Sequence, residues 1–171
     1  AAHVADVGLH HVDGAHLDVK ISYVRETQPL GTAGPLALVR DTAALTKDEP
    51  LLVMNGDNYY AVSACRELAR LGGSGLVGFD RDGLVRNSNI PSERIRQFAL
   101  VQRDDEGFLS TIVEKPDPAT YQALVETALV SMNLWAFTPV IFEACRRVHP
   151  SVRGELELQD AVRIAIEDFG E

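Results

Sequence analysis

The sequence is poor in the features that crosslink a chain or anchor it in a membrane. It has only two cysteines in 171 residues, Cys65 and Cys145, and their separation fits neither a disulfide framework nor a paired-cysteine metal site. No apolar run approaches the ~18 to 20 residues that cross a bilayer, and the N-terminal residues lack the basic-then-apolar order of a secretion signal. These absences predict a soluble cytoplasmic protein with reduced thiols and no contact with a membrane.

Basic residues are also scarce. The chain has 16 lysines and arginines against 25 aspartates and glutamates, which gives a formal net charge of −9. A broad basic surface for the backbone of a nucleic acid is therefore not expected, although this balance leaves room for a local basic pocket that binds phosphate groups. We predict that nucleic acid is not a partner.

Apolar residues make up 46% of the chain, enough for one globular domain with a sizeable core. They form strand-length runs that alternate with segments of helical period, and residues 98–114 predict two strands joined by a turn at 104–107. This order predicts a Rossmann-like α/β fold with three layers, in which helices cover both faces of a central sheet. We expect that sheet to be mostly parallel and to include residues 19–23, 51–54 and 130–137.

Polar residues follow three of the predicted strands, at the strand ends where α/β sheets bind their ligands. A glycine-rich loop could admit a flat ligand close to its backbone, a carboxylate could hold a divalent cation, and a glutamate-lysine pair could bind hydroxyl and phosphate groups. Each stretch alone has a simpler explanation as a helix cap or an exposed ion pair. The stretches are Pro29 to Gly34 with Glu26 before it, Asn55 to Asp57, and Glu114 to Pro116.

Four segments resemble, in the same order, segments of the sugar-phosphate nucleotidyltransferases, or nucleotide-sugar pyrophosphorylases, which share a Rossmann-like fold. The segments are "PLGTAGPLAL", "LLVMNGD", "IVEKP" and "RGELELQDAV". They are similar to the family's nucleoside loop, metal-bearing strand, sugar-phosphate strand and a later segment of its catalytic domain. The resemblance implies an enzyme that transfers a nucleoside monophosphate from a nucleoside triphosphate to a sugar 1-phosphate, giving a nucleotide sugar and pyrophosphate.

The resemblance also implies roles for individual residues. Asp57 would hold Mg²⁺ and, with Lys115, support catalysis, while Glu114 would accept hydrogen bonds from sugar hydroxyls. Ala99, Asn133 and Lys115 would complete the sugar-phosphate site. The carboxylate of a glutamate can only accept hydrogen bonds, which suits the N–H donors of guanine. The nucleotide would lie against Glu26, Pro29, Gly31, Thr32 and Ala33.

Two indications about the substrates conflict. The first segment is most similar to mannose-1-phosphate guanylyltransferases and the fourth to glucose-1-phosphate thymidylyltransferases. The base is therefore undecided, with guanylyl transfer to mannose 1-phosphate slightly favoured.

The sequence departs from the family's motifs at two places. Phe98-Ala99 stands where the family has an aromatic-glycine pair, and Ser131-Met132-Asn133 stands where it has an Asn-x-Gly stretch. We expect contacts with the sugar to differ at these two places.

The family's glycine-rich phosphate loop would precede Ala1, and its second metal-binding aspartate would follow Glu171. We therefore expect residues 1–171 to be a partial nucleotidyltransferase domain, incomplete at both ends and inactive alone, and we leave homo-oligomerisation open. Two alternatives also stay open: a non-catalytic relative that binds nucleotide sugars and regulates a partner, and a metal-dependent glycosyltransferase. The latter usually has two nearby carboxylates after its metal strand, whereas "DNYY" supplies only Asp57.

Overall fold

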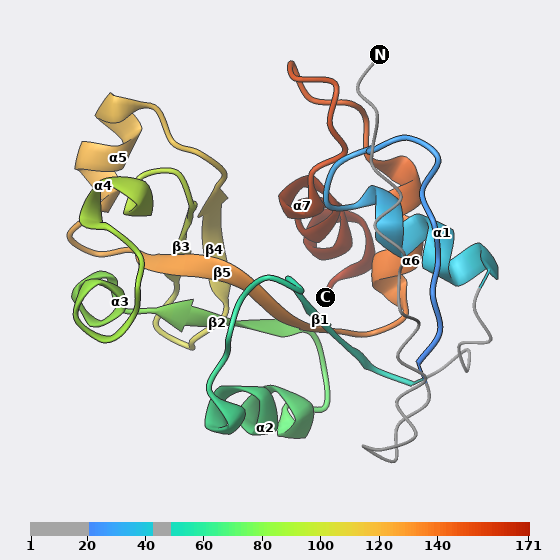
Figure 1. Cartoon of the computed structure of the whole chain (residues 1–171), viewed down its shortest axis with the longest axis horizontal. Helices are drawn as coiled ribbons and strands as arrows, with labels where there is room; N and C mark the ends of the chain where they lie inside the picture. The colour runs from blue at the N-terminus through green and yellow to red at the C-terminus, as the bar shows by residue number, and fades with distance from the viewer. Residues whose placement is uncertain (1–20, 43–48) are drawn as a thin grey trace.

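The computed structural model of the protein describes residues 21–42 and 49–171. Its helices (Figure 1) are α1 (Gly34–Thr42), α2 (Val62–Arg70), α3 (Arg81–Asn87), α4 (Ser92–Ile95), α5 (Pro118–Leu124), α6 (Val140–Arg147) and α7 (Leu158–Phe169). Its strands are β1 (Leu51–Met54), β2 (Gly75–Phe79), β3 (Ala99–Arg103), β4 (Leu109–Val113) and β5 (Leu129–Phe137). Helices and strands alternate along much of this range, which confirms the predicted α/β class.

All five strands belong to one sheet, in which β5 pairs with three others. The N-terminal half of β5 pairs with β3, its C-terminal half pairs with β1, and β2 lies along it, while β4 pairs with β3. Each of these pairs is antiparallel. The prediction of a mostly parallel sheet is therefore wrong for the described strands. β1, β2 and β3 run in the same direction, but none of them pairs with another of the three. Each pairs with β5, which runs in the opposite direction. An apolar run indicates burial of both faces of a strand and does not determine its direction.

The side chains of β5 alternate between apolar cores on the two faces of the sheet. Trp135 and Phe137 pack with buried residues of α1, α6 and α7, whereas Leu134 and Ala136 pack with Leu68 of α2. Farther toward its N-terminal end, even-numbered residues of the strand pack against α4 and β3. Helices therefore cover both faces of the sheet (Figure 1), which confirms the predicted three layers.

The predicted strand over 19–23 is wrong in its described part. Residues 21–24 are not in a strand, and Ile21 and Tyr23 are 38% and 53% exposed. Alternation at period two shows which side chains could share a face, but a strand also needs a neighbour for its backbone hydrogen bonds. No strand pairs with residues 21–24 in the described part of the chain. Residues 19 and 20 lie outside the described residues.

The predicted strand pair over 98–114 is confirmed. β3 and β4 form an antiparallel hairpin in which Leu100 is paired with Val113. In the turn, the Asp104 backbone N–H donates to the carbonyl of Phe108 at 2.9 Å, and the Asp104 carboxylate accepts the Phe108 N–H at 2.8 Å. The turn is completed by Gly107 with a φ of 94°, a conformation that glycine adopts without steric cost.

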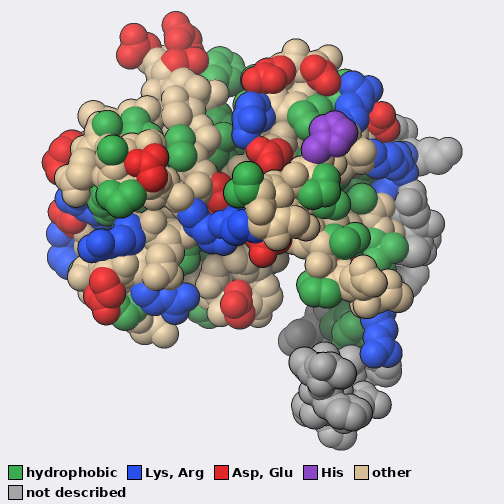
Figure 2. All heavy atoms as spheres, turned by 90° about the horizontal axis from the view of Figure 1, so that it is seen from above, with side chains coloured by type: hydrophobic (Ala, Val, Ile, Leu, Met, Phe, Trp, Pro, Cys, Tyr) green, Lys and Arg blue, Asp and Glu red, His purple; other side chains and the backbone are tan. Residues whose placement is uncertain are grey.

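Acidic and basic side chains are interspersed on the face of the molecule in Figure 2, with no extended field of one sign. Elsewhere on the surface, charges pair along one helix, as Arg70 of α2 does with Glu67 at 3.2 Å. Exposed pairs of this kind contribute about 1 kcal/mol or less, so they affect the solvation of the surface more than the stability of the fold. Within residues 21–42 and 49–171, the helices are too short or too polar to cross a bilayer.

Candidate active site

A cavity of about 380 Å³ opens between segments that are far apart in the sequence. The loop before α1, the ends of β1 and β4, the middle of β5 and the start of α7 all contribute to its wall. Six predicted site residues line it: Gly31, Thr32, Ala99, Glu114, Lys115 and Asn133. The lining is completed by Asn55, Arg94, Gln97, Phe98, Ser131, Glu155, Glu157 and Gln159. The "PLGTAG" loop and the "EKP" strand therefore meet at one cavity.

The glycine-rich loop is held against the segment that leads into α7. Leu156 donates its backbone N–H to the carbonyl of Leu30 at 2.6 Å and accepts the N–H of Ala33 at 2.9 Å. Gly31 lies between these bonds with a φ of 94°, and a Cβ at this position would lie 2.7 Å from the backbone of Leu156. Only glycine fits so close an approach. Part of the loop's backbone is thus used to build the cavity wall and is not free to bind a nucleotide.

Thr32 connects the same loop to α7. Its Oγ1 accepts the backbone N–H of Leu158 at 2.9 Å, and it therefore caps a helix whose own N-cap residue, Glu157, makes no capping bond. Thr32 also lines the cavity. Because a hydroxyl can donate as well as accept, its proton stays available for a ligand.

Three of the predicted nucleotide-binding residues lie away from the cavity. Ala33 is fully buried in the core, and its N–H is already bonded to Leu156. Pro29 is exposed and Glu26 is half-buried, and neither lines the cavity. Glu26 Oε1 is nonetheless shielded from solvent without a hydrogen-bond partner. The turn of the chain at Gly31 directs only that residue and the next one toward the cavity.

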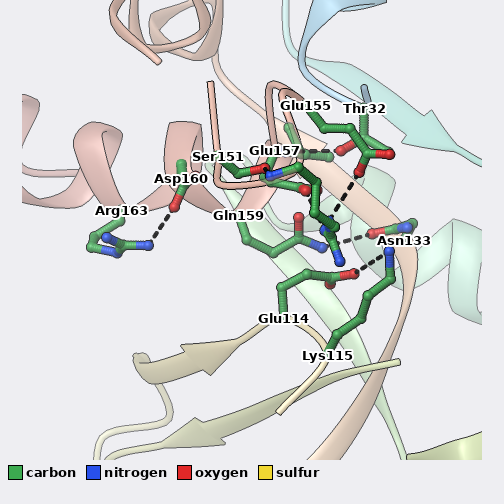
Figure 3. A network of polar contacts seen from close by, with 12 residues as sticks. Thr32, Glu114, Lys115, Asn133, Ser151, Glu155, Glu157, Gln159, Asp160 and Arg163 are labelled. Atoms are coloured by element: carbon green, nitrogen blue, oxygen red, sulfur yellow. Dashed lines mark hydrogen bonds and ion pairs between the residues drawn. The ribbon is translucent and has the colours of Figure 1, made fainter. Parts of the chain in front are cut away.

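Glu114 and Lys115 project side by side from the end of β4 (Figure 3). Lys115 has a φ of 43°, and its Nζ lies 3.9 Å from Glu114 Oε1. Burial raises the pKa of Glu114 above its ordinary value, and the Lys115 cation offsets part of this rise. The pair therefore offers an acceptor for hydroxyl groups beside a partly exposed cation.

Arg153 bridges two carboxylates, and its positive charge also acts on Glu114. It forms ion pairs with Glu155 at 3.3 Å and with Glu157, and Glu157 is only 7% exposed. The hydrogen bond from Arg153 to Glu157 raises the pKa of the guanidinium. Lys115 and Arg153 thus place two cations among the carboxylates of Glu114, Glu155 and Glu157. Such a mixture suits a ligand that carries both phosphate oxygens and hydroxyls.

The floor of the cavity is the middle of β5. Ser131 and Asn133 line it, and Ala99 of β3 is paired with Ser131. Asn133 has a φ of 55°, and Lys115 is the only other non-glycine residue with a positive φ in the described part of the chain. Left-handed backbone costs about 1–2 kcal/mol for such residues and clusters at functional sites. Both of these residues lie on this cavity.

Asp57 follows β1 but does not line the cavity, whereas Asn55, two residues earlier, does. Tyr60 holds this loop to the sheet, because its hydroxyl donates to a backbone carbonyl of β5 at 2.6 Å and accepts the N–H of Asn55 at 3.3 Å. Asp57 itself is exposed. Within residues 21–42 and 49–171, no group of three or more His, Cys, Asp or Glu side chains is placed to hold a metal ion. Of the three stretches that follow predicted strands, those of Gly31 and Lys115 contribute these residues to the cavity wall, whereas Asp57 lies outside it.

Sequence reasoning missed several residues of the wall. Glu155, Glu157 and Gln159 come from the segment "RGELELQDAV", where polar side chains alternate with leucines. That alternation is the signal that could have found Glu155 and Glu157, since it places both on one side of an extended segment, whereas Gln159 lies in the first turn of α7. Arg94 and Gln97 come from α4, a helix of four residues, and from the turn after it. So short a helix shows no period, and nothing in the sequence marks these two residues.

A single sheet with helices on both faces, and a cavity of mixed charge beside its strand ends, are features of a Rossmann-like α/β protein with a site for a polar ligand. The family described as nucleotidyl transferase matches residues 3–170. The chain therefore belongs to the nucleotidyl transferase family, and its curated relatives are sugar-phosphate nucleotidyltransferases. The family predicted from the four sequence segments is confirmed.

The relatives carry different substrate names. The chain is 31% identical over 157 residues to the low-salt glycan biosynthesis nucleotidyltransferase Agl11 of Haloferax volcanii, covering 91% of this chain and 39% of the relative. It is 30% identical over 164 residues to a glucose-1-phosphate thymidylyltransferase of Streptomyces griseus (96% and 41% covered). It is 32% identical over 143 residues to a mannose-1-phosphate guanylyltransferase catalytic subunit beta of Dictyostelium discoideum (82% and 35% covered).

The fold is similar to that of a solved UDP-glucose pyrophosphorylase complexed with UDP-glucose. The TM-score is 0.60 at 18% identity, and the match covers 86% of this chain and 54% of that chain. This likeness confirms the Rossmann-like nucleotidyltransferase fold. The chain spans less than two thirds of the length of each of these relatives.

Proposed function

We propose that this chain contributes the sugar-phosphate site and part of the nucleotide site of an enzyme that transfers a nucleoside monophosphate from a nucleoside triphosphate to a sugar 1-phosphate. One observation carries the proposal: the "PLGTAG" loop and the "EKP" strand line the same cavity of about 380 Å³. A volume of a few hundred Å³ is usual for a small-molecule site. A nucleotide loop and a sugar-phosphate strand can serve one ligand only if they meet in this way.

The reaction joins an oxygen of the sugar's phosphate to the α-phosphorus of the nucleoside triphosphate. The bond from that phosphorus to the bridging oxygen breaks, and pyrophosphate leaves. The protein's contribution is to align the two substrates and to offset the charge on their phosphates. In this arrangement Lys115 donates to the sugar's phosphate and Glu114 accepts from sugar hydroxyls. Gly31 and Thr32 lie against the nucleoside.

The oxygen donors after β1 fit a Mg²⁺ ion whose coordination is completed by substrate. Mg²⁺ takes oxygen ligands and is usually held by one or two carboxylates together with substrate phosphates and water. Asp57 is the carboxylate at the end of β1, and Asn55 adds a carbonyl oxygen at the cavity wall. We propose Asp57 as the protein ligand; an ion held there would supply positive charge to the reacting phosphates.

For the base and the sugar, we propose guanylyl transfer to mannose 1-phosphate. The support is the carboxylate of Glu26, which can only accept hydrogen bonds, since guanine offers N–H donors. Glu26 lies outside the cavity, so the base would extend along the loop beyond Gly31. Thymidylyl transfer to glucose 1-phosphate is the competing assignment. We place the reaction in the cytoplasm, the usual compartment of soluble nucleotide-sugar enzymes.

A non-catalytic role in binding nucleotide sugars is the second candidate. One observation favours it, because the exposed carboxylate of Asp57 lies outside the cavity. The cavity would then hold a nucleotide sugar without turnover. No comparable observation favours a glycosyltransferase, given the family match over residues 3–170.

The test measures pyrophosphate release from each pair of nucleoside triphosphate and sugar 1-phosphate in the presence of Mg²⁺. It uses the 171-residue chain and the chain with any flanking sequence that its gene encodes. In the form that turns over, we expect kcat/KM to fall about 10²–10³-fold in Lys115→Ala, because a charged contact to phosphate is lost. Arg70→Ala, on the exposed side of α2, is the control and keeps full turnover.

The outcomes separate the two candidates. Turnover that is insensitive to Lys115→Ala would contradict the proposed site. Calorimetric binding of a nucleotide sugar without turnover in any form would favour the non-catalytic role. A protein that neither binds nor turns over these ligands would contradict both.

A further inference from the structure

Two carboxamide side chains meet on the floor of the cavity, one from β5 and one from the first turn of α7 (Figure 3). Gln159 Nε2 donates to Asn133 Oδ1 at 3.5 Å. Trp135 Nε1 donates to the same oxygen, also at 3.5 Å. Gln159 is only 4% exposed, and both amides line the cavity. Most buried polar side-chain atoms have at least one hydrogen-bond partner, whereas Gln159 Oε1 has none.

The orientation of both amides follows from the indole. A Trp Nε1–H can only donate, so Asn133 must turn its oxygen toward Trp135 and its NH₂ group away. Since that oxygen is also the atom facing Gln159, Gln159 must in turn present its NH₂ group. Its own Oε1 is then buried with no donor nearby. The arrangement that orients the Asn133 amide therefore leaves Gln159 Oε1 buried without a hydrogen-bond partner.

The backbone of Asn133 also has an uncommon conformation. Its φ of 55° is a left-handed conformation, which asparagine tolerates better than most residues. Asn133 Nδ2 has no hydrogen-bond partner within the part of the chain that the structure describes, and one N–H of Gln159 Nε2 is also left over. Asn133 and Gln159 both line the cavity, whose wall also includes Glu114, and the carboxylate of Glu114 accepts hydrogen bonds.

A hydroxyl group is the ligand that fits between amide donors and a carboxylate, because it accepts from the first and donates to the second. A methylene group can do neither. We propose that Asn133 and Gln159 together recognise one hydroxyl of the sugar. Asn133 contacts the hydroxyl, and Gln159 is the positioning residue that fixes the orientation of the Asn133 amide. This inference rests on the proposed function and specifies how that site selects its sugar against deoxy analogues. Sites built to bond a hydroxyl reject the analogue that lacks it, because their polar groups are left unpaired.

The experiment compares three variants with the wild type in the form of the protein that is active. Gln159→Met keeps the length of the side chain and removes the amide. Asn133→Gly removes the contacting side chain and is compatible with a positive φ. Gln102→Met is the matched control, since Gln102 bonds Thr127 on an exposed part of the surface. The readout is the ratio of kcat/KM for the sugar 1-phosphate to that for each of its monodeoxy analogues, with the thermal unfolding midpoint measured in parallel.

We expect the wild type to reject one monodeoxy analogue about 10⁴-fold. Gln159→Met and Asn133→Gly each reduce that ratio about tenfold or more, and the double variant reduces it no further than Asn133→Gly does. The other analogues and the Gln102→Met control keep wild-type ratios. Gln159→Met leaves the unfolding midpoint unchanged or raises it, because it removes an unpaired buried oxygen.

A lower midpoint in Gln159→Met together with an unchanged discrimination ratio would overturn the inference, because Gln159 would then serve the fold alone. Failure of the proposed function gives a different result, which is a wild type without turnover. Calorimetry with a nucleotide sugar and its deoxy analogues then applies the same comparison to binding. Equal affinities for all of them in the wild type would overturn the inference as well.

Discussion

The hydroxyl of Thr32 accepts the backbone N–H of Leu158 at 2.9 Å, across 126 residues of sequence. A loop near the start of the described chain thereby caps the helix near its end. The first backbone N–H groups of any helix lack partners within the helix, and here a distant side chain supplies one. The nucleotide loop and the α7 wall of the cavity are consequently one structural unit.

Replacing Thr32 by valine should destabilise the protein by about 1 kcal/mol, because valine keeps the shape but cannot cap α7. Thr32→Ser retains the hydroxyl and should stay within about 0.5 kcal/mol of the wild type. Urea denaturation of both variants measures the free energies of unfolding. Equal stability of the two variants would show that the cap contributes nothing.

Gly31→Ala should destabilise far more than an alanine at another glycine with positive φ. Gly72 has a φ of 73° and open space around the position of a Cβ, so Gly72→Ala should cost only the backbone term of about 1–2 kcal/mol. At Gly31 a Cβ would also meet the Leu156 backbone at 2.7 Å, which adds about 1–3 kcal/mol of overpacking. Chemical denaturation should therefore rank Gly31→Ala as clearly the less stable variant.

Glu114 should make the free energy of unfolding depend on pH. Its pKa is raised in the folded state, chiefly by burial, so between the ordinary value and the raised one the native state binds more protons than the unfolded state. Stability contributed by this group therefore falls as pH increases through that window. Glu114→Gln should gain stability relative to the wild type from about pH 4.5 toward neutrality, in denaturation measured at several pH values. Glu106→Gln, in the exposed hairpin turn, is the control for loss of one negative charge.

The two cysteines should react with a thiol reagent at very different rates. Cys145 is 2% exposed, and burial raises the pKa of its thiol to about 12, which leaves about one molecule in 10⁴ as thiolate at pH 8. Cys65 is only partly buried. Native protein should therefore be labelled once per chain, and a second label should appear on addition of denaturant. In Cys65→Ala, labelling of the native state should be nearly absent, and rapid labelling there would place Cys145 at the surface.

Burial could be predicted from the sequence more reliably than strand direction. The apolar run that became β5 was correctly predicted as a strand, and Trp135 and Phe137 do share one face of it. Its direction depends on how the β3–β4 hairpin and α5 return the chain to the sheet, which no local pattern encodes. The helices α3, α4 and α5 were not predicted, since each has only four to seven residues and shows too little of a period.

Parts of the candidate site could be noticed in the sequence where a local pattern marks them, such as a glycine-rich loop or polar residues directly after a strand. The glycine-rich loop around Gly31 and the Glu114–Lys115 pair after a strand can be noticed in the sequence alone, but only the resemblance to the family implies their roles. Asp57 also follows a strand, yet the contact of Tyr60 with β5 sets the path of its loop, and Asp57 remains outside the cavity. Gln159 could not be singled out, because its importance depends on Asn133 and Trp135, which reach it only through the fold.

The bonds that join Leu156 to Leu30 and Ala33 also set an order of events during synthesis. The loop that carries Gly31 emerges from the ribosome long before the segment on which it rests. Until the C-terminal segment is made, those backbone groups have water as their only partner, and one wall of the cavity does not exist. Contacts between such distant parts of a chain form slowly, because the loop they close is long. A nascent chain that ends before α7 would therefore carry the "PLGTAG" and "EKP" residues without a site for them to share.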